Sequence, residues 1–268
     1  MCVNQKVKLN TAPLLQKKLF STLPFVYVLL VHFILGLSYR SIGQTTVAET
    51  ALWFDSLRNR EIPVAIYWPA KSEKVMGVLV FSHGYGQNQP NSHTAYNYLT
   101  TFLAQQGFLV LSIQHELASD SLLPLQGPAQ IVRRSNWERG AQNIAFVIRQ
   151  VGQRYPSTRK LPIQLVGHSN GGDMSVLFAK LYPDQVSKVI SLDHRRMPMA
   201  LSSKPSYYSL RSIDQEADAG VLPNLDDQKQ FNIRITQLKY AHHNGMDDSG
   251  TPKEHDEIKT WVLRYLLE

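Results

Sequence analysis

The distribution of apolar residues predicts alternating strands and helices from residue 77 onward. Residues 77–82 and 108–113 are short, continuous apolar runs, which are typical of strands buried on both faces of a sheet. Between them, residues 94–106 have a helical pattern that ends at Gly107. Strands and helices that alternate in this way predict a mainly parallel sheet with helices on both faces.

The same alternation continues to the end of the chain. Further strands are predicted at 163–166, 186–192, 207–211 and 233–240, and further helices at 137–148, 174–181 and 258–266. Two more strands are predicted at 51–55 and 61–67. Pro63 indicates that the second of these is an edge strand, because proline cannot donate to a sheet ladder. The sheet therefore has about eight strands.

Two of the predicted connections between elements affect how accessible the carboxyl ends of the strands are. Residues 114–135 are punctuated by Pro124, Gly127 and Pro128, and we expect an irregular loop over the carboxyl ends of the strands. Only residues 193–206 separate two predicted strands further on, which leaves no room there for a separate lid domain.

The N-terminal segment has the pattern of a targeting signal. Lysines precede an apolar run at 25–37, and Ser41, Ile42 and Gly43 supply small residues near a predicted cleavage point. We therefore predict a signal peptide at 1–43, an exported (secreted or periplasmic) protein and a single catalytic domain at 44–268. The apolar run is shorter than the ~20 residues of a spanning helix. An uncleaved anchor, with a membrane tether through residues 25–37, remains the alternative.

Net charge and cysteine content reduce the number of possible classes of function. The formal net charge is +7, but five of the basic residues lie in the first 43 positions, which contain no acid, so the remainder carries only +2. This balance gives no support to nucleic-acid binding. Cys2 is the only cysteine, so the predicted mature chain has neither disulfides nor a thiol nucleophile.

The residues 167–171 read Gly-His-Ser-Asn-Gly, between a predicted strand and a predicted helix. G-x-S-x-G in this context is a nucleophile elbow, in which a sharp turn exposes the serine hydroxyl, here that of Ser169. The helix that follows directs free N–H groups at the serine, where negative charge develops during acyl transfer. His168 is expected to pack or hydrogen-bond beneath the turn, and Asp173 to be favourable near the helix start.

A serine nucleophile needs a base, an orienting acid and an oxyanion site. In a parallel sheet these groups lie in loops after the carboxyl ends of strands. Ser169, Asp193, Asp214 and the pair His242 and His243 each follow a predicted strand, in the order Ser, Asp, His that is expected of this elbow.

The oxyanion site requires two backbone N–H groups. One is expected from Asn170, the residue after the nucleophile, and the other from Tyr85 in the loop 83–86. The imidazoles and carboxylates at 242–248 match no strong metal-binding pattern, so we expect no metal site there.

From about residue 51 the chain resembles the α/β-hydrolases. It is most similar to the compact branch with dienelactone hydrolases, platelet-activating-factor acetylhydrolase-like proteins, chlorophyllase-like proteins and bacterial polyester hydrolases. The resemblance rests on residues 82–86 and 167–172, Asp214 and His243. Asn170 stands where the polyester enzymes carry Met, and Ser169 differs from the cysteine nucleophile of dienelactone hydrolases proper.

The resemblance implies an α/β-hydrolase fold and cleavage of a small-molecule or polymer carboxylic ester without a cofactor. It implies that the catalytic residues are Ser169, His243 and Asp214, because the histidine stands directly before Asn and the acid a few residues past a strand end. Asp193 remains the alternative acid. Amide or peptide cleavage on the same residues and a non-catalytic binding protein remain the alternative functions. The oligomeric state stays open.

The predicted signal peptide gives a first test. N-terminal sequencing of the native exported protein is expected to begin after about Gly43, because small residues there follow the apolar run. An intact Met1 in a membrane fraction would favour the anchor instead.

Overall fold

The computed structural model describes residues 47–69 and 74–268. These residues belong to one compact unit, Gln44–Glu268. The predicted signal peptide at 1–43 lies outside the described residues. Within the described ranges, no helix is both long enough and apolar enough to cross a membrane.

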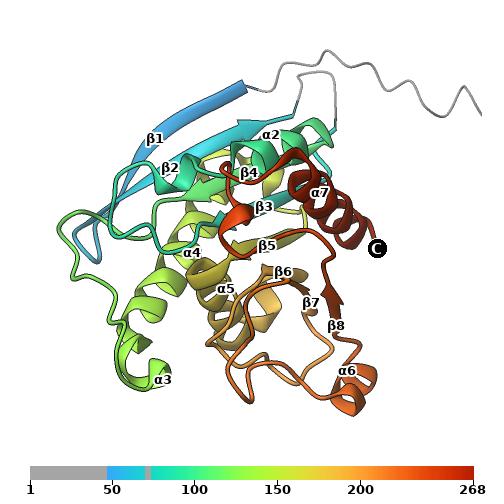
Figure 1. Ribbon diagram of the computed structural model, residues 1–268. Coiled ribbons are helices and arrows are strands. Elements are labelled where there is room, and N and C mark those ends of the chain that lie inside the picture. Colours follow the sequence, from blue (N-terminus) through green and yellow to red (C-terminus); the bar gives the residue numbers. More distant parts are fainter. Residues whose placement is uncertain (1–46, 70–73) are drawn as a thin grey trace, which may run out of the picture. The chain divides into compact units, whose positions relative to one another are not determined.

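Within the described residues, eight strands form one sheet in the order β1-β2-β4-β3-β5-β6-β7-β8 (Figure 1). The strands are β1 (Val47–Asp55), β2 (Arg60–Trp68), β3 (Gly77–Ser82), β4 (Phe108–Ile113), β5 (Ile163–His168), β6 (Lys188–Leu192), β7 (Ser206–Arg211) and β8 (Arg234–Gln237). β2 runs antiparallel to β1 and to β4, and all other pairs are parallel. The predicted mainly parallel sheet of about eight strands is confirmed.

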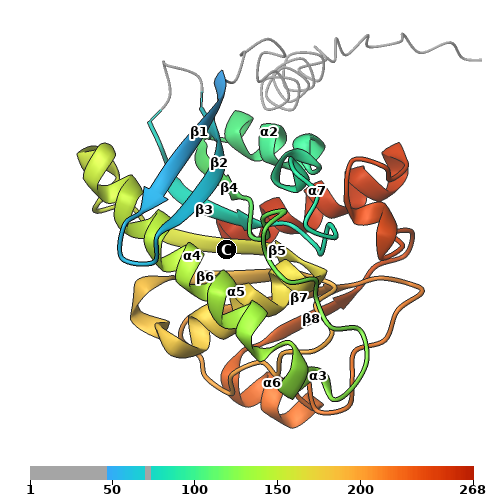
Figure 2. The same cartoon turned by 90° about the vertical axis from the view of Figure 1, so that its left-hand side faces the viewer.

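Helices cover both faces of this sheet (Figures 1 and 2). The described α-helices are α2 (Asn97–Gln105), α3 (Ala129–Val132), α4 (Arg134–Arg154), α5 (Ser169–Leu181), α6 (Leu225–Phe231) and α7 (Pro252–Leu267). Apolar residues of α4 and α5 belong to one core cluster, and those of α2 and α7 belong to a second.

The alternation of side chains along a strand explains why there are two clusters. Every residue of β3 is buried. Val78 and Val80 pack into the cluster with α4 and α5, whereas Leu79 and Phe81 pack into the cluster with α2 and α7. Burial of such a side chain contributes roughly 1.5–3 kcal/mol, so continuous apolar strands hold the sheet between its two helical layers.

Pro63 does not mark an edge strand, because β2 pairs with both β1 and β4. The ladder between β2 and β4 covers Val64–Tyr67 and begins after the proline. The missing N–H of Pro63 therefore removes no hydrogen bond to β4, while its carbonyl accepts one from the N–H of Gln114.

The segment 114–135 is more ordered than expected, because it contains α3 and α4 begins at Arg134. The connection between β6 and β7 holds no helix or strand, consistent with the expected absence of a separate lid domain there.

The register of the parallel strands determines which residues meet at their carboxyl ends. Ser82 of β3 lies opposite Gly167 of β5, and His168 of β5 lies opposite Leu192 of β6. The next residues on β5 and β6, Ser169 and Asp193, therefore leave the sheet side by side. Leu192 lies opposite Leu210 of β7, which brings Arg211 beside Asp193.

Candidate active site

The sharp turn at Ser169 is the elbow that the sequence predicted. Ser169 joins β5 directly to α5 and has φ 50°, a left-handed conformation that a non-glycine residue adopts only under constraint. A Cβ on Gly171 would lie 2.3 Å from the carbonyl oxygen of His83, and a Cβ on Gly167 would lie 2.5 Å from that of Gly171. Only glycine allows backbones to approach so closely.

His243 lies against the serine. Its Nε2 is 3.0 Å from Ser169 Oγ, and its side chain is nearly buried. His242 faces away, with a side chain that is 58% exposed and Nδ1 2.9 Å from Glu254 Oε1. The structure thus places the predicted member of the histidine pair at the serine.

The loop that carries His243 is tied to the start of α7. Glu254 accepts hydrogen bonds from the N–H of His242 and from the N–H and hydroxyl of Thr251, the N-cap of the helix. Burial alone would raise the pKa of Glu254, but these hydrogen bonds outweigh it and lower that pKa to about 2. The carboxylate is therefore ionised and holds the loop to the helix.

Asp193, not Asp214, contacts the imidazole. Its Oδ2 lies 2.5 Å from His243 Nδ1, and the residue is fully buried. With Nδ1–H donating to the carboxylate, Nε2 is free to accept the proton of the Ser169 hydroxyl. Asp214, which the resemblance implied as the acid, does not contact the imidazole, and the alternative, Asp193, does.

The physical reason is the strand order. Asp193 follows β6, which pairs with the strand of Ser169, whereas Asp214 lies three residues beyond the end of β7. Asp214 instead accepts a hydrogen bond from the backbone N–H of His243 at 2.7 Å. It thus supports the histidine through the main chain.

The carboxylate of Asp193 has further partners that stabilise its negative charge. Arg211 Nη2 is 2.8 Å from Oδ1, and Ser212 donates to the carboxylate from its N–H and its hydroxyl. Burial alone would raise the pKa of Asp193, but the hydrogen bond with His243, the charge of Arg211 and the donors of Ser212 lower it. Asp193 is therefore ionised, and it forms an ion pair with Arg211.

His168 packs beneath the elbow, as predicted. The N–H of Gly84 donates to the hydroxyl of Tyr96, which in turn donates to His168 Nδ1 at 2.7 Å. Burial and the nearby His243 lower the pKa of His168 to about 3, so it is neutral and is not a competing base. Tyr96 thus links the loop after β3 to the elbow.

The two predicted oxyanion residues lie on these same elements. Asn170 is the second residue of α5, so its N–H is among the first four that no carbonyl of the helix can accept. Tyr85 lies in the loop directly after β3, and its hydroxyl accepts a hydrogen bond from the N–H of Leu123. The segment 114–135 therefore packs on the Tyr85 loop at the carboxyl ends of the strands.

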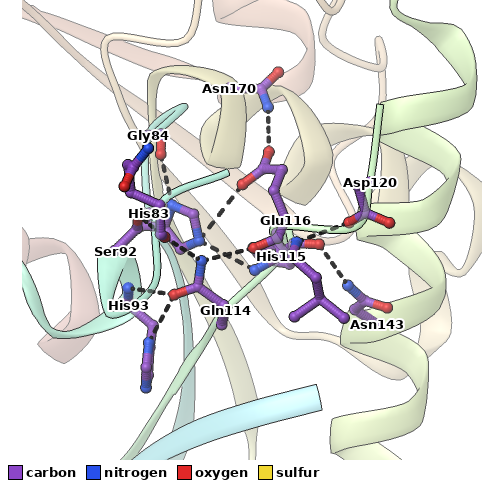
Figure 3. Close-up of polar contacts among 12 residues, drawn as sticks. His83, Gly84, Ser92, His93, Gln114, His115, Glu116, Asp120, Asn143 and Asn170 are labelled. Carbon is purple, nitrogen blue, oxygen red and sulfur yellow. Dashed lines mark hydrogen bonds and ion pairs between the residues drawn. The ribbon is translucent and has the colours of Figure 1, made fainter. Parts of the chain in front are cut away.

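Sequence reasoning missed a buried polar cluster beside this site (Figure 3). The side chain of Asn170 contacts Glu116, Asn136 and Trp137, and Trp137 donates its indole N–H at 2.9 Å. No local pattern reveals this cluster, because its members come from three separate segments.

Comparisons with known proteins agree with this architecture. A family model described as serine aminopeptidase, S33, matches residues 73–192. The structure of a dienelactone hydrolase from Anabaena variabilis has a TM-score of 0.56 at 16% identity and covers 82% of this chain and 97% of its own. The chain has the α/β-hydrolase fold.

Two further α/β-hydrolase structures resemble it to a similar degree. XC6422 from Xanthomonas campestris, an α/β serine hydrolase without a lid, has a TM-score of 0.56 at 12% identity, covering 85% of this chain and 98% of its own. Brefeldin A esterase, a bacterial enzyme, has a TM-score of 0.55 at 14% identity, covering 88% and 82%. No curated protein sequence matches the chain. At these identities the similarity shows the α/β-hydrolase fold.

Asp173 connects this α/β-hydrolase elbow to the Asp193 loop. Its Oδ1 accepts hydrogen bonds from the N–H groups of Arg196 and Met197, at 3.0 and 2.9 Å. Burial raises the pKa of Asp173 to about 6, despite these hydrogen bonds. The expected benefit of its charge at the helix start is thus outweighed by desolvation.

Because the folded-state pKa is raised from 3.8, Asp173 contributes stability below about pH 4 that is lost as the pH rises through 6. Asp173→Asn keeps an oxygen acceptor and carries no charge. We expect it to raise the free energy of unfolding by up to about 3 kcal/mol at pH 8 and to have little effect at pH 4. Denaturant unfolding at both values measures this, and an equal effect at the two would contradict it.

Proposed function

We propose that the chain is a serine hydrolase that cleaves carboxylic esters, with Ser169 as nucleophile, His243 as general base and Asp193 as the orienting acid. The observation that carries the proposal is one unbroken series of contacts. Ser169 Oγ lies 3.0 Å from His243 Nε2, and His243 Nδ1 lies 2.5 Å from Asp193 Oδ2, at the N-terminus of α5.

In the first half of the reaction, Ser169 Oγ attacks the acyl carbon while its proton moves to His243 Nε2. The buried, ionised Asp193 stabilises the imidazolium that forms. The tetrahedral intermediate then collapses, and the imidazolium transfers the proton to the alkoxide oxygen of the leaving alcohol. The products of this half are a free alcohol and an acyl group on Ser169.

In the second half, His243 takes a proton from water, and the resulting hydroxide oxygen attacks the acyl carbon. Collapse of the second intermediate returns the proton to Ser169 and releases the carboxylic acid. The N–H groups of Tyr85 and Asn170 are proposed to bind the oxyanion in both halves. The positive end of the α5 dipole, where Asn170 lies, also stabilises the negative charge of the oxyanion.

One rival activity has an observation in its favour. The family model that matches 73–192 is described as a serine aminopeptidase, so amide cleavage on the same residues is the second candidate. Amide hydrolysis requires that the leaving amine, a poorer leaving group than an alcohol, be protonated. The imidazolium of His243 can donate this proton as well. Initial rates on nitrophenyl esters and nitroanilides with the same acyl group separate the two activities.

We also propose that the enzyme acts on small-molecule or polymer esters outside the cytoplasm. The support is the order of lysines, apolar run and small residues in 1–43.

Replacement of the serine is the direct test. Ser169→Ala is expected to lower kcat for a nitrophenyl ester by at least roughly 10⁴-fold, because no nucleophile remains to form the acyl-enzyme. It is also expected to abolish labelling by a fluorophosphonate probe while leaving the circular dichroism spectrum unchanged. Near wild-type hydrolysis by the variant would exclude Ser169, and a wild-type chain that neither labels nor hydrolyses would indicate a binding protein.

The acid is tested by a matched pair of variants. Asp193→Asn is expected to lower kcat by roughly 10⁴-fold, because an amide at this position favours the wrong tautomer of His243. Asp214→Asn, which keeps an oxygen for the backbone N–H of His243, is expected to lose less than about tenfold. Both values come from steady-state kinetics on one ester, and the opposite ranking would return the role to Asp214.

A further inference from the structure

Glu116 is a buried carboxyl group that the proposed reaction does not use. It lies three residues past the end of β4 and is 1% exposed. Figure 3 shows its carboxyl group between His83 and Asn170, which come from the loop after β3 and from the start of α5. These are the two elements that carry the proposed oxyanion donors.

One oxygen of Glu116 holds the Asn170 side chain. Oε1 accepts a hydrogen bond from Asn170 Nδ2 at 3.0 Å. The second proton of Nδ2 goes to Asn136 Oδ1 at 2.9 Å, and Asn170 Oδ1 accepts the indole N–H of Trp137. Because the indole can only donate, the orientation of the amide is determined. These hydrogen bonds hold the side chain of Asn170 on both sides. They thereby restrict the position of Asn170, whose backbone N–H is a proposed oxyanion donor.

The other oxygen lies against His83. Oε2 is 3.6 Å from His83 Nε2, and it has no hydrogen-bond partner among the described residues. His83 Nε2 accepts the N–H of His115, so its proton is on Nδ1, which donates to the carbonyl oxygen of Gly84 at 2.5 Å. Because Nε2 carries no proton, Glu116 Oε2 lies near this ring without a hydrogen bond to it and without an ion pair.

That carbonyl determines the direction of the Tyr85 N–H. The Gly84 carbonyl and the Tyr85 N–H belong to one peptide unit, and in a planar trans peptide they point in opposite directions. A hydrogen bond that fixes the Gly84 oxygen therefore fixes the Tyr85 N–H as well. His83, held by the N–H of His115, therefore orients the Tyr85 N–H without a bond from Glu116.

We propose that Glu116 is a positioning residue that holds Asn170, through its side chain, so that the Asn170 N–H, one of the two proposed oxyanion donors, stays in register with Ser169. The proposal rests on the ester hydrolase function proposed above. Glu116 itself touches neither the serine nor the histidine base in the described contacts. Its effect is on the transition state, because the oxyanion exists only there.

Two substitutions of Glu116 separate the effect of its shape and hydrogen bonding from the effect of its charge. Glu116→Gln has the same shape and keeps an oxygen that can accept from Asn170, whereas Glu116→Ala removes both contacts. The alanine variant is expected to lower kcat by roughly 10- to 100-fold with KM within about twofold, since loss of one oxyanion donor costs roughly 10²–10³-fold. The glutamine variant is expected to keep kcat within about threefold of wild type.

Thr158→Ala is the matched control. Thr158 is also a buried polar residue and donates its hydroxyl to the carbonyl of Tyr155, but it lies in the turn between α4 and the start of β5, away from Glu116 and Asn170. It is expected to lower stability while leaving kcat and KM near wild type. Equal losses of kcat in the two alanine variants would overturn the proposal in favour of general destabilisation. Equal losses in the glutamine and alanine variants would overturn it in favour of charge.

A boronic acid inhibitor gives a readout of the tetrahedral state. Its adduct with Ser169 places an oxygen in the oxyanion site, so its Ki should rise in Glu116→Ala by about the same factor as kcat falls. An unchanged Ki beside a lowered kcat would overturn the proposal.

The backbone amide signals of Tyr85 and Asn170 give a readout that needs no catalysis. In ¹⁵N-labelled protein the Asn170 signal is expected to shift in Glu116→Ala and to stay near its wild-type position in Glu116→Gln, while the Tyr85 signal changes less. An unchanged Asn170 signal in the alanine variant would overturn the positioning role even if kcat falls. If the wild-type protein hydrolyses no ester, the proposed function fails, whereas a shifted Asn170 signal would still support the positioning of its N–H.

Discussion

The buried hydrogen bond between His243 and Asp193 is the interaction on which the site depends. It joins a loop near the C-terminal helix to the end of a central strand, and it determines which nitrogen of the imidazole faces Ser169. An isolated carboxylate in that position would be costly to bury. Arg211 and Ser212, at the end of the neighbouring strand, supply the charge and the donors that keep it ionised.

The parallel sheet makes this arrangement possible. Its central strands are apolar at nearly every position and are held between two helical layers, so their carboxyl ends lie at fixed spacings. Polar residues that follow the strands are then brought together without long connections. The same edge holds a second polar cluster around Glu116, which lies beneath the proposed oxyanion site and contacts Asn170 and His83.

The polar residues around Asp193 and those around Glu116 contact different parts of the site. On one side, Asp193 and its partners act on the base through hydrogen bonds and charge. On the other side, Glu116 and Trp137 hold the side chain of Asn170, and His83 is hydrogen-bonded to the carbonyl of Gly84. The elbow at Ser169 lies between them, and its strained backbone conformation is held by glycines that allow the strand and helix to pass closely.

The sequence by itself determined the elements and the elbow. Apolar runs, helical spacing and the pattern around Ser169 are local, so the strand-turn-helix unit and the mainly parallel sheet could be predicted from neighbouring residues. The same local reasoning placed Tyr85 and Asn170 on the correct elements. For the histidine, the resemblance to the α/β-hydrolases named His243, and the structure places that residue against the serine.

Only the tertiary structure decided which carboxylate contacts the imidazole and which groups support it. Asp193 and Asp214 both follow strands, and the choice between them depends on which strand pairs with the strand of Ser169 and on their register. The contacts of Glu116 with His83 and Asn170 join residues that are 33 and 54 positions apart in the chain, and no local pattern encodes them. Such choices are made by strand order and packing, because these bring distant side chains within hydrogen-bonding distance.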